Sequence, residues 1–354
     1  MNKKTLPLLA GSAILTGLGV YLYASKVEAK NFKLETVRVT TYGADEPPSG
    51  NVNGNGNGNL SGNGNGNLSG NGNGNIGGNG NGHGKHAEKK IFRILHLSDT
   101  HLSEPEAEKL RFLEEVTDGD FDLVVLTGDV FENYTGLKYA SSLLSRQPKL
   151  GAYAVLGNHD YYNYSFFNKI VGRINRRWRH PMEYRDVKPM IKALSNTGWD
   201  VLLNESRTHA EGVHVVGVDY PGIEPAELTR LVSEAPDGHM KLALFHMPRF
   251  LHTFVDAGVD IAVGGHTHGG QIRVPGVGAL ITDSELSRKE ASGLIYRGKT
   301  AFHISRGLSA DPRSNFRLFC PPAATIIEVV HKPYAVHPEQ DLVYAGPRES
   351  SFVD

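Results

Sequence analysis

Residues 91–101 of this 354-residue chain read IFRILHLSDTH, and this stretch decides the fold class. Its first part, Ile91 to Leu97, is mostly apolar, which predicts a strand buried in a sheet. Asp99 and His101 follow at the carboxyl end of that strand. In open α/β sheets, binding sites form just beyond the carboxyl ends of the strands. The stretch therefore predicts one strand of such a sheet with a functional site at its end.

Helical and strand patterns alternate along the chain beyond this stretch. Helices are expected over Glu104 to Val116 and Tyr134 to Leu144, with strands at Phe121 to Leu126 and Gly151 to Leu156. Such alternation predicts a largely parallel sheet that helices cover on both faces. Further strands are expected at Val201 to Leu203, Val213 to Val218, Leu242 to Phe245, Ile261 to Val263, Ala301 to Ile304 and Thr325 to Val330.

Polar residues that can bind metals follow five of the expected strands. One strand that ends in Asp or His indicates little, but five such strands are hard to explain by packing. Because sites in open α/β sheets form beyond the carboxyl ends of the strands, these side chains are expected at the same edge. The set is Asp99, His101, Asp129, Asn158, His159, Asp160, His246, His266 and His268.

The donor types in this set indicate a class of metal. Carboxylates, imidazoles and an amide, without thiolates, suit Mn, Fe, Zn, Ni or Mg rather than copper or an iron–sulfur cluster. Cys320 is the only cysteine, which excludes a thiolate-rich zinc cluster and an intrachain disulfide. Two cations about 3.5–4 Å apart need a bridging carboxylate, and Asp129 is the candidate because it lies centrally in the set. The expected cofactor is a pair of divalent ions, with manganese favoured.

Four motifs together resemble the calcineurin-like metallophosphoesterase family over roughly residues 91 to 330. They are Asp99-x-His101, Gly128-Asp129, Gly157-Asn158-His159-Asp160 and Gly265-His266-x-His268. The resemblance implies a four-layer α/β/β/α sandwich with a dinuclear metal centre. It also implies that one metal binds Asp99, His101, Asp129 and His268, and that the other binds Asp129, Asn158, His246 and His266.

His159 and Asp160 follow the expected ligand Asn158 and carry the catalytic prediction. His159 is expected to act as the general acid or as a donor to the negative charge that develops on the substrate. Asp160 is expected to accept a hydrogen bond from the ring of His159 and thereby to raise the pKa of His159. The alternative is that the two residues form a structural turn pair.

The N-terminal 30 residues are expected to be a membrane anchor. An uncharged apolar run extends from Leu6 to Ala24 behind Lys3 and Lys4, and its length is close to the roughly 20 residues that span a bilayer. The flanking lysines favour a catalytic domain outside the cytoplasm. The alternative is a signal peptide cleaved near Ala29, which would give a secreted protein.

The remaining chain divides by composition. Residues 31–48 are expected to be a juxtamembrane segment, and the Gly/Asn-rich residues 49–88 a flexible linker that holds the catalytic domain away from the bilayer. That domain is expected over residues 89–332, followed by a tail over 333–354.

Three basic features allow two interpretations each. Residues 164–180 combine apolar residues at helical spacing with five basic residues, which fits either a membrane-contact lid or an ordinary surface helix. Arg306 and Arg249 follow strands and could contact a substrate phosphate or serve a structural role.

The motifs further resemble the membrane-associated subgroup of the family, which includes broad-specificity phosphodiesterases and UDP-2,3-diacylglucosamine pyrophosphatases. The expected function is therefore hydrolysis of a phosphodiester or pyrophosphate, with a glycolipid or nucleotide sugar among the expected substrates. One alternative is a phosphomonoesterase that acts on nucleotides or phosphoproteins, and another is a non-catalytic metal-stabilised binding module. Nucleic acid is not an expected partner, because the net charge is −1 and no basic stripe lies outside residues 164–180.

Overall fold

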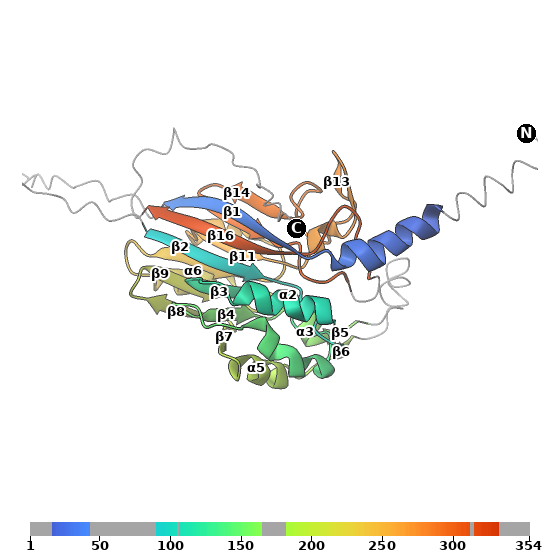
Figure 1. Cartoon of the computed structure of the whole chain (residues 1–354). Coiled ribbons are helices and arrows are strands. Elements are labelled where there is room, and N and C mark those ends of the chain that lie inside the picture. Colours follow the sequence, from blue (N-terminus) through green and yellow to red (C-terminus); the bar gives the residue numbers. More distant parts are fainter. Residues whose placement is uncertain (1–15, 43–89, 105, 165–181, 312–314, 333–354) are drawn as a thin grey trace, which may run out of the picture.

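The computed structural model describes residues 16–42, 90–104, 106–164, 182–311 and 315–332 (Figure 1). Two six-stranded mixed sheets form the centre of this part of the chain. The first has the order β1-β16-β2-β3-β4-β7 and the second the order β14-β15-β11-β10-β9-β8. The first sheet contains β1 (Lys33–Tyr42), β2 (Lys90–Leu97), β3 (Leu123–Thr127), β4 (Ala152–Val155), β7 (Trp199–Val201) and β16 (Ala323–Lys332). The second contains β8 (Glu205–His209), β9 (Val213–Gly217), β10 (Met240–Leu244), β11 (Ile261–Gly264), β14 (Gly293–Arg297) and β15 (Thr300–Ile304).

Helices cover the outer face of each sheet. On the first sheet these are α2 (Ala107–Thr117), η3 (Tyr134–Leu143) and α5 (Lys188–Ser195), and on the second α6 (Pro225–Ser233) and α7 (Leu251–Asp256). Neighbouring residues of β2 show the layering, because Leu95 packs on the helical side while Ile94 packs between the sheets against residues of β9 and β10. Strands that are covered on both faces typically have apolar residues in succession along their length. The two sheets between layers of helices confirm the expected α/β fold.

Shorter elements complete the described chain. They are η1 (Tyr23–Val27), η2 (Glu28–Lys30), α3 (Asn158–Tyr161), β5 (Tyr162–Asn163), β6 (Glu183–Tyr184), η5 (His268–Gly270), β12 (Arg273–Val274) and β13 (Gly278–Ala279). The helix expected over Tyr134 to Leu144 is a 3₁₀ helix, and the strand expected at Val201 to Leu203 lies two residues earlier, at Trp199–Val201. The strands β1, β8 and β14, which lie at edges of the two sheets, were not predicted from the sequence.

The position of β1 corrects the interpretation of the Gly/Asn tract. β1 pairs in parallel with β16 along its whole length, from Lys33 beside Ala323 to Tyr42 beside Lys332. β2 pairs with the other side of β16 and begins with Lys90 beside His331. Residues 43–89 lie outside the described chain, but they connect two strands that flank the same neighbour. The predictions of a juxtamembrane segment over residues 31–48 and of a domain that begins at residue 89 are therefore wrong, since Lys33–Tyr42 already belongs to the sheet.

A helical segment over residues 16–30 leads directly into β1. It packs on residues 315–320: the Arg317 N–H donates to the carbonyl of Ala24 at 3.1 Å, and the Cys320 N–H donates to buried Glu28 at 2.6 Å. None of the helices in the described part of the chain is long and apolar enough to span a membrane. The anchor stays a prediction, because residues 1–15 lie outside that part, as do the expected contact segment after Tyr164 and the tail.

Candidate metal centre

Strands from both sheets deliver the candidate ligands to one place. β2, β3 and β4 run parallel in the first sheet, and β10 and β11 run parallel in the second. The residues that follow their carboxyl ends include every candidate ligand. Close approach between these loops depends on glycine, because a Cβ on Gly157 would lie 2.3 Å from Oδ1 of Asp129 and 2.4 Å from its backbone nitrogen.

The backbone at the strand ends is strained. Five candidate ligands have φ between 42° and 70°, a region that non-glycine residues rarely adopt and that costs about 1–3 kcal/mol per residue. These residues lie two to four positions after the strand ends, where the chain turns into the site. Strain of this kind persists where the surrounding structure imposes it, and it is typical of functional sites. The five residues are Asp99, His101, Asp129, His266 and His268.

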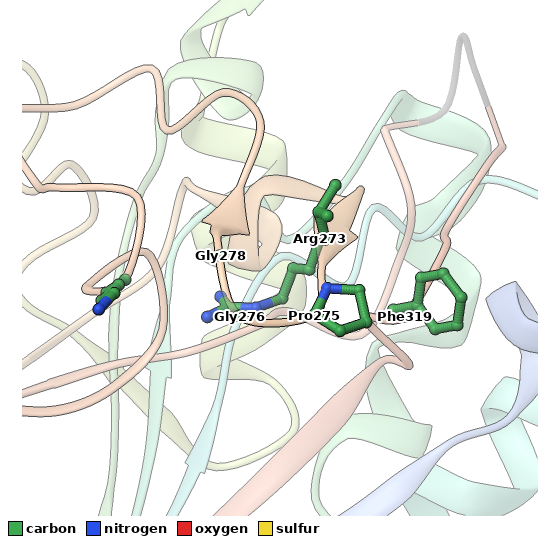
Figure 2. Close-up of a pocket in the computed structure, with 7 residues that line it drawn as sticks. Arg273, Pro275, Gly276, Gly278 and Phe319 are labelled. Atoms are coloured by element: carbon green, nitrogen blue, oxygen red, sulfur yellow. The ribbon is translucent and has the colours of Figure 1, made fainter.

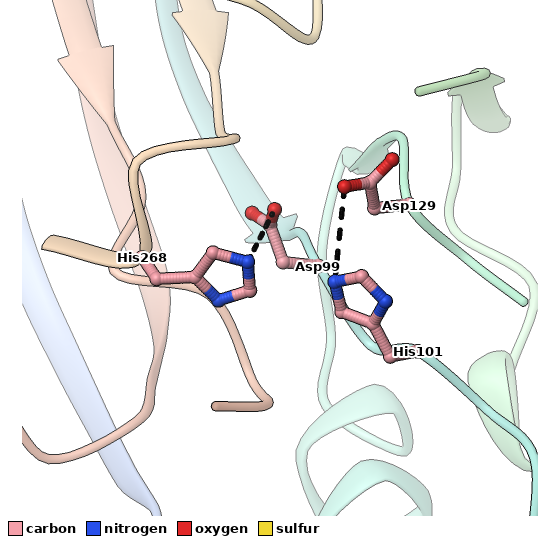
Figure 3. Close-up of side chains that lie close together, drawn as sticks. All are labelled: Asp99, His101, Asp129 and His268. Carbon is pink, nitrogen blue, oxygen red and sulfur yellow. Dashed lines mark ion pairs between the residues drawn. The ribbon is translucent and has the colours of Figure 1, made fainter. Parts of the chain in front are cut away.

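The first cluster brings together the four residues expected to hold one metal. The donor atoms of Asp99, His101, Asp129 and His268 lie within 4.8 Å of one another, and all four residues are buried. Figure 3 shows their side chains converging from the ends of β2 and β3 and from the loop after β11. Nε2 of His268 lies 3.6 Å from Oδ1 of Asp99. Nε2 of His101 lies 3.7 Å from Oδ2 of Asp129.

The second cluster contains Asp129, His246 and His266, whose donor atoms also lie within 4.8 Å of one another. Nε2 of His246 lies 3.2 Å from Oδ2 of Asp129 and 3.1 Å from Oδ1 of Asn158. Asp129 therefore belongs to both clusters, which is the arrangement that a bridging carboxylate requires.

Hydrogen bonds from Nδ1 to backbone carbonyls orient two of the imidazoles. Nδ1 of His246 donates to the carbonyl of Thr127 at 2.8 Å, and Nδ1 of His268 donates to the carbonyl of Ser309 at 2.7 Å. A carbonyl accepts only from a protonated nitrogen, so Nε2 keeps its lone pair for a metal. Nε2 of His101 is buried and makes no hydrogen bond, as expected of a metal ligand. The residues therefore fit a pair of divalent cations.

Asp129 and His246 each stabilise the charged form of the other. Burial disfavours the charged form of His246, but Asp129 and Asp99 outweigh it and raise the pKa of His246 to about 9. Burial would also raise the pKa of Asp129, yet the imidazoles, His246 foremost, hold it well below its usual value. Burial lowers the pKa of His268, and that of His266 falls to about 4. Asp129 is therefore ionised and His266 and His268 are neutral, which is the protonation state in which these groups bind metals, whereas His246 releases its extra proton when a metal binds.

Comparison with known proteins agrees with this geometry. A family model described as calcineurin-like phosphoesterase matches residues 92–270 of the chain. The chain belongs to the calcineurin-like phosphoesterase family. Together with the buried clusters, this establishes the protein as a metallophosphoesterase, a hydrolase of phosphate esters.

Several curated proteins are similar in sequence to this phosphoesterase. The uncharacterized metallophosphoesterase YkoQ of Bacillus subtilis is 29% identical, over 64% of this chain and 78% of YkoQ. The UDP-2,3-diacylglucosamine pyrophosphatase LpxG of Chlamydia muridarum is 26% identical, over 68% of this chain and 84% of LpxG. The phosphodiesterase YaeI of Escherichia coli is 27% identical, over 68% of this chain and 82% of YaeI.

The carboxylate of Asp160 in the phosphoesterase lies among backbone N–H groups, whereas it was expected at the ring of His159. Its carboxylate accepts backbone N–H bonds from Val130 and Phe131 at 3.0 Å and from Gly157 at 2.8 Å. It thereby holds the loop after Asp129 against the loop that carries Asn158. Burial, followed by the charge of Asp129, raises its pKa to about 6. These contacts indicate a structural role in the turn, which was the alternative interpretation.

Glu132 is the carboxylate that the structure places at the ring of His159, and it was not predicted from the sequence. Its Oε2 lies 3.3 Å from Nδ1 of His159 and 2.9 Å from Nδ1 of the candidate ligand His101. Burial lowers the pKa of His159, against the expected rise, while Asp129 and Glu132 act in the opposite direction. The available signal was an acidic residue three positions after Asp129, in the same loop.

The two arginines named in the sequence analysis lie in different surroundings. Arg306 forms an ion pair with Glu35 of β1. Arg249 lines a cavity of about 330 Å³ that also borders the candidate ligand His246. Other residues of its lining are Tyr220, Pro221, Met247 and Phe250. A substrate group could therefore contact Arg249 from the metal centre, whereas Arg306 is held by β1.

Proposed function

We propose that this protein is a membrane-anchored phosphodiesterase or pyrophosphatase with two divalent cations, manganese first among them. The observation that carries the proposal is the pair of donor clusters that share Asp129, next to the buried ring of His159. Bound there, two cations would neutralise phosphate charge and lower the pKa of water, so that hydroxide is available at neutral pH.

His159 is the proposed general acid. Its backbone N–H donates to Oδ1 of Asp129 at 2.7 Å, which ties the residue to the carboxylate shared by both clusters. Glu132 and Asp129 favour the protonated ring, and an anionic phosphate that enters the site adds a further negative charge in the same direction. The imidazolium can then give its proton to the leaving oxygen as the bond to phosphorus breaks.

The cavity beside His246 favours a diester or pyrophosphate over a monoester. A monoester carries one organic group, whereas a diester needs room for a second group next to the metal centre. The cavity offers about 330 Å³, the cationic Arg249 and the apolar or aromatic surfaces of Tyr220 and Phe250. The names of LpxG and YaeI, a pyrophosphatase and a phosphodiesterase, support the same substrate class. All seven expected ligands are present, which argues against a non-catalytic binding module.

Membrane attachment and a lipid-linked substrate complete the proposal. The support is the uncharged run from Leu6 to Ala24, with Lys3 and Lys4 on its cytoplasmic side. Resistance of the full chain to extraction from membranes by alkaline carbonate tests the anchor, and release into the soluble fraction would favour the cleaved signal peptide.

The test of the activity uses the full chain in detergent, because β1 lies before the Gly/Asn tract and a fragment that begins after the tract would lack a strand. Metal is removed with a chelator and replaced by manganese, and hydrolysis of bis-p-nitrophenyl phosphate is compared with that of p-nitrophenyl phosphate. We expect the higher kcat/KM for the diester and its loss in Asp129→Asn. A preference for the monoester would favour the phosphatase alternative. No hydrolysis with two metals bound would favour the binding module.

A further inference from the structure

The helical segment over residues 16–30 lies at the same edge as the metal centre. Lys33, at the start of β1, pairs with Ala323 at the start of β16. β16 runs antiparallel to β2, so the start of β16 lies beside the carboxyl end of β2, where Thr325 pairs with His96. Asp99 follows that end directly. Figure 1 shows the blue helix extending from the end of the sheets toward which the arrow of β2 points.

This segment presents apolar side chains to solvent. Six large apolar residues of the segment are each between 42% and 55% exposed. Exposed apolar groups in such number mark a surface that contacts a partner or a membrane. We call these residues the helix surface: Leu18, Val20, Tyr21, Leu22, Tyr23 and Val27.

The β12–β13 hairpin and the adjacent loop carry a second set of exposed apolar residues. The hairpin begins only a few residues after the candidate ligand His268, and the Arg273 N–H donates to the carbonyl of Leu318 at 2.9 Å. The next loop residues therefore lie beside the hairpin, and Arg317 in turn contacts Ala24 of the helical segment. We call the exposed set, which is 39% to 59% exposed, the hairpin surface: Val274, Val277, Leu280, Ile281 and Phe319.

Basic residues accompany the hairpin surface. A cavity of about 390 Å³ at the hairpin is lined by Arg273, Lys289 and the apolar Val274, Pro275 and Phe319 (Figure 2). The exposed Arg288 lies against the hairpin, since its carbonyl accepts from the Ala279 N–H at 2.8 Å. Apolar side chains next to basic ones are typical of surfaces that lie on an anionic bilayer.

We propose that the helix surface and the hairpin surface together contact an anionic phospholipid bilayer and turn the metal centre toward it. The bilayer is the chosen partner because the uncharged run from Leu6 to Ala24 contains every residue of the helix surface except Val27. The inference rests on the proposed function and narrows it, since a metal centre at the bilayer surface would act on a phosphoester whose lipid part stays in the membrane.

The test places an environment-sensitive nitrobenzoxadiazole label at position 281 through Ile281→Cys in the full chain. The native Cys320 is fully buried and should not react. The matched control is Ile91→Cys, because Ile91 is 63% exposed. It pairs with Val330 near the start of β2, at the end of that strand opposite to the metal centre. Both proteins are reconstituted in phosphatidylcholine–phosphatidylglycerol vesicles with or without nitroxide-labelled lipid.

We expect the label at position 281 to lose about half its fluorescence to the nitroxide lipid, and the label at position 91 to lose little, because interfacial groups reach the upper acyl region. Equal quenching at both positions would overturn the proposal. A blue shift at position 281 without lipid quenching, increasing with protein density, would indicate a second copy of the chain instead. Undiminished quenching in pure phosphatidylcholine would overturn the requirement for anionic lipid. Hydrolysis of the soluble chromogenic diester by the same proteins reports separately on the proposed function.

Discussion

Oε2 of Glu132 lies 3.3 Å from Nδ1 of His159. The same oxygen lies 2.9 Å from Nδ1 of His101, a candidate metal ligand. One carboxylate thus holds both a ring expected to bind metal and the ring proposed as the general acid. Loss of its charge should disturb proton transfer and ligand orientation together.

Glu132→Gln tests this relationship because it keeps the shape of the side chain and removes its charge. We expect kcat for the diester to fall by about 10- to 100-fold, the usual effect of changing a group that orients a ligand. Burial lowers the pKa of His159 and Glu132 opposes that lowering, so without the charge of Glu132 the ring should lose its proton at lower pH. The alkaline limb of the kcat profile should then move to lower pH. Steady-state kinetics across pH would measure both effects. Glu115→Gln, at an exposed position of α2, is the control. An unchanged profile would remove Glu132 from the mechanism.

The two clusters predict a distinct metal content for each ligand variant. His268 belongs only to the first cluster and His266 only to the second, whereas Asp129 belongs to both. We therefore expect His268→Ala and His266→Ala each to retain one of two metals, and Asp129→Asn to retain the least. Elemental analysis of the reloaded, desalted proteins would measure this. Two metals per chain in Asp129→Asn would contradict its place as the bridging residue.

The buried carboxyl of Asp260, which is not a candidate metal ligand, should make the stability of the fold depend on pH. Burial raises its pKa to about 7, above the ordinary value of roughly 3.9 in the unfolded chain. Between these values the folded protein keeps a proton that the unfolded chain has released, so stability falls as pH rises through this window. Asp260→Asn removes the ionisation and can still accept the Lys241 N–H, which Asp260 accepts at 2.7 Å.

We expect the free energy of unfolding of Asp260→Asn to exceed that of the parent by on the order of 2 kcal/mol at pH 8 and to approach it near pH 4. Urea unfolding at several pH values would measure the difference. Asp237→Asn, at an exposed position, should show no such trend. A constant difference across pH would indicate a packing effect rather than ionisation.

Much of the site could be predicted because its information is local. Asp99, Asp129 and His246 each follow an apolar run, and the topology of parallel strands brings such ends together. The partner of His159 could not be predicted in this way. Asp160 is its neighbour in sequence, but consecutive residues of a helix do not face each other. Glu132 reaches the ring through a loop that the bridge between Leu102 and Phe131 positions.

The strand β1 was missed for a related reason. Lys33–Tyr42 alternates only partly between polar and apolar residues, and its partner β16 lies near the other end of the chain, with Val37 beside Ile327. Pairing over such a separation leaves no local signal. The Gly/Asn tract then suggested a domain boundary, because composition alone does not reveal that both of its ends belong to one sheet.

Shortening the Gly/Asn tract tests whether it is an insertion between strands or a spacer. Tyr42 and Lys90 flank the end of β16, so by the usual spacing between strands they lie roughly 10 Å apart. Deletion of residues 49–84 leaves a connection long enough to cover that distance. We expect the shortened protein to fold, to keep the diester kcat of the parent, and to gain about 1 kcal/mol in stability from the smaller loop-closure entropy.

Urea unfolding and chromogenic kinetics would measure these two properties, and the label at position 281 would report on the membrane contact. An insertion predicts that lipid quenching at position 281 stays the same after the deletion, because the helix surface connects to β1 before the tract begins. A spacer predicts a change in quenching, since its length would then set the distance between the domain and the bilayer. Loss of folding on deletion would instead indicate that the tract contributes contacts to the native structure, which would contradict both interpretations.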